Sequence, residues 1–438
     1  MHFNGKLKYI RHRPGGNTST SASAALKVAS YFFLVVFLVC SLAHIVATTH
    51  PWYVKIEGEK YYPAFRLLLQ NNYVDSIETK NGEVFALNYE ENPWQSLSPD
   101  VLINAPIPFG PNEQSMAKDR YLAKPLQQSI AENGVFGRHW LGTNHLGNDV
   151  LALLLHAGLT TFWLAFFIAV LAVIPGIIIG MAAGFYKNQY ASVRLIDLIF
   201  FGLGFSIGVF YGFVIRRYAL ADALTSFSFY AAAELLVSLA ILLFSTLTFR
   251  LLAMVFRPLP FFRRKLYLPL EAMTRFVVNV LNTLPKFLMM TVLVAVFVRQ
   301  GDYFLFLLIT GLFLWQYAAG VTQSAFSTPS AQRFIQKMND QGVREQALFL
   351  KIYRAFVRKK VKAVFFIAWA YALLLESSLA FLDIGITNNS LGHLLRSAFH
   401  YPEAWWIFFP TAFLLTGAIF LLMKWGMVQL QEQPQNKL

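Results

Sequence analysis

The chain has 438 residues, of which 56% are hydrophobic and only 14% are charged. One soluble core cannot bury that much apolar surface, so the composition excludes a disordered chain and a simple soluble enzyme and indicates a membrane protein. The formal charge of +14 does not require a nucleic acid, because Lys and Arg are usually in excess on the cytoplasmic segments of membrane proteins. We therefore expect a lipid bilayer as partner and no nucleic acid. The single cysteine, Cys40, cannot form an internal disulfide.

Apolar segments of about 20 residues recur along the chain and predict an all-α protein with about eight transmembrane helices. These long runs do not alternate as barrel strands do, and the bilayer core admits only helices or closed barrels. The first run is long for a signal peptide and has no clear cleavage site, so we expect an uncleaved anchor. The predicted spans lie near residues 30–48, 158–184, 195–215, 229–255, 275–298, 303–322, 363–384 and 404–425.

Orientation follows from the loops between these spans. Acidic residues outnumber basic ones between residues 50 and 155, whereas basic residues dominate residues 323–362. The positive-inside rule places the first segment outside and the second in the cytoplasm, with both termini cytoplasmic. Arg216 and Arg217 then fall outside, against the rule.

The outer segment has local signals of its own. Trp52 to Tyr62 alternates in the manner of a strand, Asn81-Gly82 marks a turn, and Ala105 to Pro111 is rich in Pro and Gly. We expect a small mixed extracytoplasmic cap that contains strands. The predicted divisions are a cytoplasmic segment (1–28), the first helix (29–49), the cap region (50–155), the second helix (156–190), an inserted helix pair (191–260), a core (261–430) with a cytoplasmic loop (323–362), and a tail (431–438).

Four ionisable residues fall in or near the apolar spans, where such groups usually face protein or water. Glu376 is the candidate for the inner pathway or for a helix contact. Arg250 is expected to extend its charge toward an interface, and Asp197 to cap a helix. The fourth is Glu234.

Residues 139–150, HWLGTNHLGNDV, precede the second span. Its two glycines permit a tight turn, and Asp149 suits the positive end of the following helix. The segment resembles the H-x-L-G-T-D-x-x-G-R-D-V string of the C-type permeases of dipeptide and oligopeptide ABC importers, with Asn144 and Asn148 replacing Asp and Arg. A ligand role and a purely structural cap both remain open. The residues that match are Gly142, Thr143, Gly147 and Asp149.

Residues 323–362 carry two apolar stripes separated by a glycine, which predicts two amphipathic helices. Gly342 and Ile352 have the spacing of the helix-turn-helix that ABC permeases insert into a groove of their ATPase. Gln336, Lys337 and Met338 stand at the E-A-A positions of that motif, and other residues replace its Leu-Pro. The resemblance implies these ATPase-coupling residues: Gln336, Met338, Gly342, Ile352 and Phe356.

Further strings resemble the same C-type permeases in the same order. Residues 376–385, ESSLAFLDIG, resemble E-A-S-L-S-F-L-G-L-G, and residues 390–395 resemble S-W-G-x-x-L. Arg275 to Asn279, with Pro285 six residues beyond Asn279, resembles the R-x-x-D start of a helix that ends in proline, with Asn279 in place of Asp. The resemblance leaves out about 191–260, where the two extra spans lie.

The resemblance implies the type I importer fold and a permease subunit for peptides or similar small solutes in a bacterial plasma (inner) membrane. Its partners would be a second related permease, two ATP-binding subunits and an extracytoplasmic solute-binding protein. ATP and Mg²⁺ would be bound by those ATPases, because this sequence has no GxxxxGK[ST] loop. We expect no cofactor, no catalytic residue and no metal, since His139 with His145 and His393 with His400 do not form a recognised zinc motif. A membrane scaffold that has lost pumping and an ion-coupled transporter are the alternatives.

Overall fold

The computed structural model describes residues 18–56, 58–66, 76–78, 84–86, 99–111, 121–126, 139–186, 191–226, 229–258, 264–299, 301–343 and 345–431. Within them the chain is mostly helical, as the apolar runs predict. Among the described residues, six helical segments are long and apolar enough to cross a membrane, or seven if one bent pair counts as a span. A shorter apolar helix covers Ser30–Ser41, at the end of α1 (Thr18–Ser41). The multi-pass architecture is confirmed, and the number eight stays a prediction.

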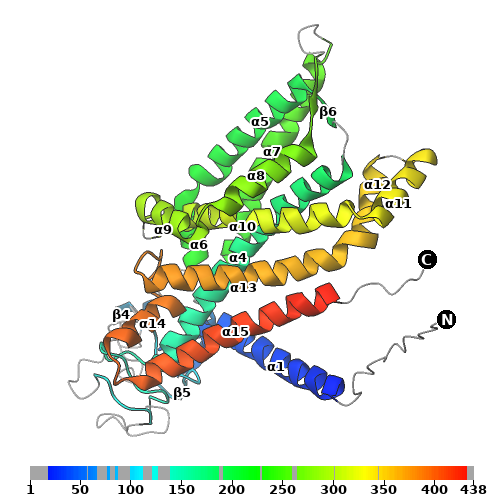
Figure 1. Cartoon of the computed structure of the whole chain (residues 1–438). Coiled ribbons are helices and arrows are strands. Elements are labelled where there is room, and N and C mark those ends of the chain that lie inside the picture. The colour runs from blue at the N-terminus through cyan, green and yellow to red at the C-terminus, as the bar shows by residue number, and fades with distance from the viewer. Residues whose placement is uncertain are drawn as a thin grey trace, which may run out of the picture.

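Four long helices form the centre of the bundle (Figure 1). They are α4 (Val150–Phe185), α10 (Tyr303–Phe326), α13 (Arg358–Phe381) and α15 (Trp405–Gln431). A row of glycines on α4 lets α10 approach closely: a Cβ at Gly176 would lie 2.5 Å from the carbonyl oxygen of Trp315, and one at Gly180 2.4 Å from that of Ala319. α1 packs against α4 and α15.

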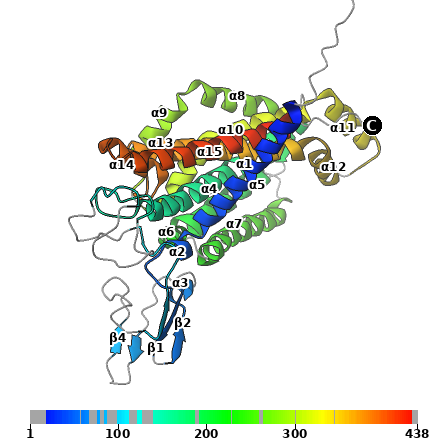
Figure 2. The same cartoon turned by 90° about the horizontal axis from the view of Figure 1, so that it is seen from below.

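The predicted span at 275–298 is wrong as a single helix. The structure has two helices, α8 (Leu270–Thr283) and α9 (Lys286–Phe297), bent by 83°. Pro285 explains the break, because proline lacks an amide hydrogen and forces Leu284 into an extended conformation (ψ 139°). Figure 2 shows the pair as an arch beside α10 and α13.

The segment outside the family resemblance forms a helical hairpin. Helix α5 (Leu195–Val209) continues through a π-helical turn to Val214, then α6 (Arg217–Ser226) leads to α7 (Phe229–Phe256). Small residues at Gly204, Gly208 and Gly212 face α7, where an added Cβ would lie 2.8–2.9 Å from α7 atoms. Close packing of the two helices therefore leaves their other apolar faces exposed.

Ion pairs close the hairpin at both ends. At one end the Arg216 guanidinium pairs with Glu234, and Arg217 donates to the Tyr218 hydroxyl at 2.6 Å. Arg216 thus neutralises an acidic residue of the neighbouring helix. Arg250, placed on α7, has an exposed side chain.

At the other end the hairpin is joined by a two-stranded ribbon of β6 (Ala191–Arg194) and β7 (Lys265–Leu268). Arg257 donates to Oδ1 of Asp197 through Nε at 3.1 Å and Nη2 at 2.9 Å. Asp197 lies in the first turn of α5, as predicted from its position, but no cap hydrogen bond from a side chain precedes that helix. Its carboxylate instead ties α5 to the end of α7.

The region after α1 contains the expected strands. A short helix, α2 (Ala43–Val46), leads to β1 (Tyr53–Ile56) and β2 (Glu59–Tyr61), which form a hairpin, and β5 (Val101–Ile103) completes the sheet in the order β2-β1-β5. Helix α3 spans Pro63–Arg66. Strands β3 (Ser76–Glu78) and β4 (Val84–Ala86) pair antiparallel around the predicted Asn81-Gly82 turn, which itself lies outside the described residues. The segment 105–111 is irregular, as predicted.

Candidate functional site

The segment between α10 and α13 is a helix-turn-helix. It consists of α11 (Pro329–Asp340) and α12 (Glu345–Ile352), followed by a π-helical turn at Tyr353–Val357. Gly342 lies between the helices with φ +70°, a left-handed conformation that glycine adopts without strain. The glycine predicted from spacing therefore occupies the turn.

The two predicted apolar stripes pack against each other and against the ends of α4 and α10. Leu348 and Ile352 are fully buried and Ile335 is nearly so. The rings of Phe334 and Phe356 meet edge to face, with centroids 5.8 Å apart. This second core is separate from the main one and includes Phe185, Ala325, Phe326, Ile335, Leu348, Ile352 and Val357, with Met338 packed at its edge.

One side chain fixes α11 directly to both long helices. Nε2 of Gln332 donates to the carbonyl oxygen of Gly184 at the end of α4 (3.3 Å) and to that of Phe326 at the end of α10 (2.9 Å). Hydrogen bonds and a packed apolar core thus connect α11 to the ends of α4 and α10.

The five predicted coupling residues fall into two groups. Gln336 is exposed on α11, and Gly342 is exposed at the turn. Met338, Ile352 and Phe356 instead lie against the protein's own second core. The polar face of α11 around Gln336 is exposed, while the apolar residues pack inside the segment.

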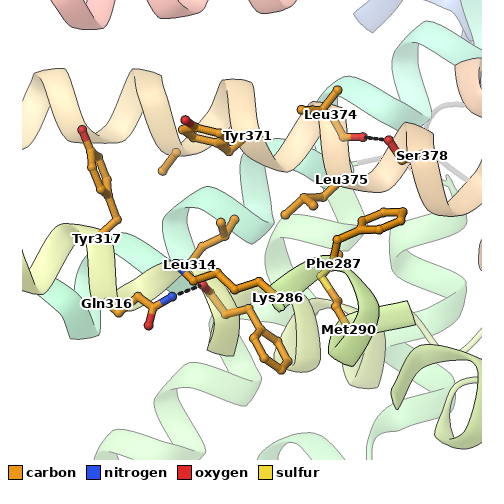
Figure 3. Close-up of a pocket in the computed structure, with 12 residues that line it drawn as sticks. Lys286, Phe287, Met290, Leu314, Gln316, Tyr317, Tyr371, Leu374, Leu375 and Ser378 are labelled. Atoms are coloured by element: carbon orange, nitrogen blue, oxygen red, sulfur yellow. Dashed lines mark hydrogen bonds between the residues drawn. The ribbon is translucent and has the colours of Figure 1, made fainter. Parts of the chain in front are cut away.

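A cavity of about 570 Å³ opens between α9, α10 and α13 (Figure 3). Its wall is mostly apolar, with polar groups from Lys286, Gln316, Tyr317, Tyr371 and Ser378. Nε2 of Gln316 donates to the carbonyl oxygen of Phe313 (3.0 Å), which leaves its buried Oε1 with no hydrogen-bond partner among the described residues. Such a mixture of apolar walls and a few polar groups is typical of sites for small solutes.

The sequence reasoning did not single out these cavity residues. The available signal was a pair of polar residues, Gln316 and Tyr317, inside an apolar run, together with Lys286 directly after Pro285. Gln316 and Tyr317 meet Tyr371 because α10 packs on α13, and α9 adds Lys286; the apolar pattern does not encode this packing.

Glu376 lies away from that cavity. It is 3% exposed, and its carboxylate accepts hydrogen bonds from the neighbouring Ser377 hydroxyl (3.2 Å to Oε2) and from the Thr161 hydroxyl of α4. Oγ1 of Thr161 also accepts from the backbone nitrogen of Leu391 at 3.0 Å, at the start of α14 (Leu391–His400). Of the two roles predicted for Glu376, the geometry favours a contact between helices.

The motif at 139–150 builds the start of α4. Gly142 (φ +75°) and Gly147 (φ +82°) make the tight turn that the sequence predicts. Oδ1 of Asp149 caps α4 by accepting from the backbone nitrogen of Ala152 (2.7 Å), and Oδ2 lies 2.9 Å from Nδ1 of His139. The helix begins at Val150, earlier than the apolar window suggested, because Asp149 fixes its first turn.

The remaining polar residues of the motif are also engaged within the chain. Oγ1 of Thr143 accepts from the backbone nitrogen of Ala123 (2.8 Å), and the carbonyl oxygen of Thr143 accepts from Nε1 of Trp406 (3.1 Å). Oδ1 of Asn144 accepts from two backbone nitrogens of its own turn, and Nδ2 of Asn148 donates to the carbonyl oxygen of Pro111 (2.7 Å). The motif therefore joins α4 and α15 to the segments around Pro111 and Ala123, and these contacts favour the structural interpretation.

Three histidines surround the α14 side of this motif. The ring of His145 stacks on Tyr401 with centroids 4.7 Å apart. Burial lowers the pKa of His145, and the charges that His393 and His400 would carry lower it further. Burial also lowers the pKa of His393, although Asp383 opposes that effect. Within the described residues, no group of three or more His, Cys, Asp or Glu could hold a metal ion.

Comparison with known proteins gives two similar permeases and no matching family model. The chain is 35% identical over 94 residues to the di/tripeptide transport system permease protein DppC of Pseudomonas aeruginosa, which is 21% of this chain and 29% of that protein. It is 25% identical over 162 residues to the inner membrane ABC transporter permease protein YejE of Escherichia coli, which is 36% of this chain and 43% of that protein. The chain spans less than half the length of each. These weak similarities to transport permeases support a divergent relationship to ABC transporter permeases.

Proposed function

We propose that this protein is one permease subunit of an ATP-driven importer of peptides or similar small solutes in a bacterial inner membrane. It pairs with a second, related permease, and two ATP-binding subunits contact it from the cytoplasm. A solute-binding protein delivers the solute on the other side. The observation that carries the proposal is the helix-turn-helix α11–α12, which is fixed to α4 and α10 and presents a polar face outward, in a chain similar to transport permeases.

The mechanism is a mechanical one. Closure of the ATPase pair on bound ATP moves α11, and Gln332 and the second core pass that movement to α4 and α10. Because α10 forms one wall of the cavity with α9 and α13, the movement changes access to the cavity. The cavity is the half of the solute path that this subunit supplies, and the second permease supplies the other half.

The orientation follows from the same assignment. The α11–α12 end is cytoplasmic, since basic residues dominate the segment 323–362. Helix α1 begins and α15 ends near that end of the bundle (Figure 1), which agrees with two cytoplasmic termini. The β2-β1-β5 sheet and α14 then lie outside, where a solute-binding protein docks.

The test is purification from the native membrane followed by reconstitution. We expect an ATPase pair and a second permease to co-purify, and solute uptake into proteoliposomes to require ATP inside the compartment that holds the ATPases. A scaffold without pumping activity would show no ATP-dependent uptake, and an ion-coupled transporter would take up solute without ATP. Either result would overturn the proposal.

A further inference from the structure

The hairpin that the permease resemblance does not cover has a polar cavity at its base. The cavity has a volume of about 390 Å³ and lies where the β6–β7 ribbon meets the ends of α5 and α7. Three of its residues are cationic and one is anionic. The residues that line the cavity come from the ribbon and the two helix ends: Ser192, Val193, Arg194, Asp197, Arg257 and Lys265.

Among the described residues that line this cavity, one carboxylate accompanies three cationic side chains. Asp197 is engaged by two hydrogen bonds from Arg257. Arg194 and Lys265 stand directly opposite each other in the antiparallel ribbon, so their side chains leave the same face about 5 Å apart at Cβ. Neither has an ion-pair partner among the described residues. Like charges placed opposite each other repel, and an anion between them would remove that cost.

The cavity lies at the boundary of the apolar part of the hairpin. Both helix ends are apolar next to the cavity. Helix α5 begins with Leu195, directly after Arg194, and Leu198 is exposed one turn later. At the end of α7, Val255 is 71% exposed. The ribbon adds Tyr267, 65% exposed, and aromatic residues of this kind are enriched at membrane interfaces. The cations therefore lie beside exposed apolar side chains that suit acyl chains.

The chain also fixes which end of the bundle this is. α4 ends at Phe185 beside α11, and β6 begins at Ala191. So short a connection spans at most about 20 Å, which keeps the cavity at the α11–α12 end. Basic pockets between helix ends on the cytoplasmic side are a known arrangement for binding lipid phosphates.

We propose that this cavity binds the phosphate headgroup of an anionic phospholipid, with Arg194 and Lys265 as its cationic ligands and the exposed flanks of α5 and α7 as the surface for its acyl chains. Arg257 is held by Asp197 and forms the back of the site. The site belongs to the inserted hairpin and does not depend on solute transport.

The test uses the full-length protein in detergent, stripped of lipid and titrated separately with phosphatidylglycerol, phosphatidylcholine and inorganic phosphate. Native mass spectrometry measures the bound lipid, and thermal unfolding reports stabilisation. We expect phosphatidylglycerol to bind more tightly than phosphatidylcholine, and the double variant Arg194→Ala/Lys265→Ala to weaken phosphatidylglycerol binding about 30-fold, from two lost cation contacts.

A matched control exists in the other sheet. Lys55 and Lys60 are also opposite each other in an antiparallel pair, so Lys55→Ala/Lys60→Ala removes the same charge without touching the cavity. This variant should bind phosphatidylglycerol as the unmodified protein does, and Arg194→Lys should retain most of the affinity. Equal loss in both double variants, or no loss in either, would overturn the site. Inorganic phosphate binding as tightly as phosphatidylglycerol would show a site for free phosphate and overturn the lipid assignment.

Discussion

Replacing Gly180 by alanine tests the close packing of α4 on α10. The new Cβ would lie 2.4 Å from the carbonyl oxygen of Ala319, about 1 Å closer than ordinary van der Waals contact. Since the obstructing atom belongs to the backbone, the two helices must separate, and we expect a loss of about 1–3 kcal/mol of stability. Helices in a membrane associate mainly through van der Waals packing, so the loss of close contact between α4 and α10 weakens their association directly.

Gly320 of α10 provides the control. A Cβ there would meet nothing within 4 Å, so Gly320→Ala changes only the backbone freedom of the helix. Alanine is favoured over glycine inside helices by about 0.5–1 kcal/mol, and this variant should be as stable as the unmodified protein or more so. Thermal unfolding of the purified proteins measures the difference. If Gly180→Ala unfolds at the same temperature as Gly320→Ala, or higher, the packing argument is refuted.

Three further predictions concern polar residues. Asp149→Ala removes the cap of α4 and leaves buried His139 without its partner, so stability should fall by about 2 kcal/mol. Asp149→Asn should retain the cap. Equal unfolding temperatures of these two variants would contradict the prediction. The pKa of His145 is lowered in the folded protein, so the unfolded chain binds more protons, and stability should fall as the pH drops below 6.5. His145→Gln should make the unfolding temperature depend less on pH in this range. An unchanged slope of unfolding temperature against pH would refute the prediction. Glu376→Ala should destabilise the protein by about 1–3 kcal/mol, because the Ser377 and Thr161 hydroxyls lose the carboxylate to which they donate. Glu376→Gln should transport solute in proportion to the amount of folded protein. Loss of transport at full stability would instead place Glu376 on the solute path.

The sequence predicted those features that depend on local periodicity and on turn chemistry. The apolar stripes of α11 and α12 and the turn at Gly342 could be located because each rests on residues close in the chain. The cap at Asp149 was predictable for the same reason. Even the break at Pro285 had a signal, although an apolar window treats a proline as one residue among many.

Features that depend on distant segments could not be predicted. The ion pair of Arg216 with Glu234 requires that α5 and α7 form a hairpin in one particular register. The cavity between α9, α10 and α13 requires these three helices to pack in one particular arrangement, and periodicity gives a helix no direction in space. The direction in which Glu376 points follows likewise from how α13 packs on α4.

The account rests on α11–α12 being the element through which an ATPase moves this subunit, and Gly342 gives the most direct test. A φ of +70° is strained for a β-branched residue, whereas asparagine adopts it at little cost. No described atom lies within 4 Å of a Cβ added at Gly342, so a substitution strains the backbone of the turn and creates no clash. In the reconstituted complex, we expect Gly342→Val to lower the ratio of solute-stimulated to basal ATP hydrolysis, with Gly342→Asn near the unmodified value. Equal stimulation in both variants, with both complexes intact, would contradict the account.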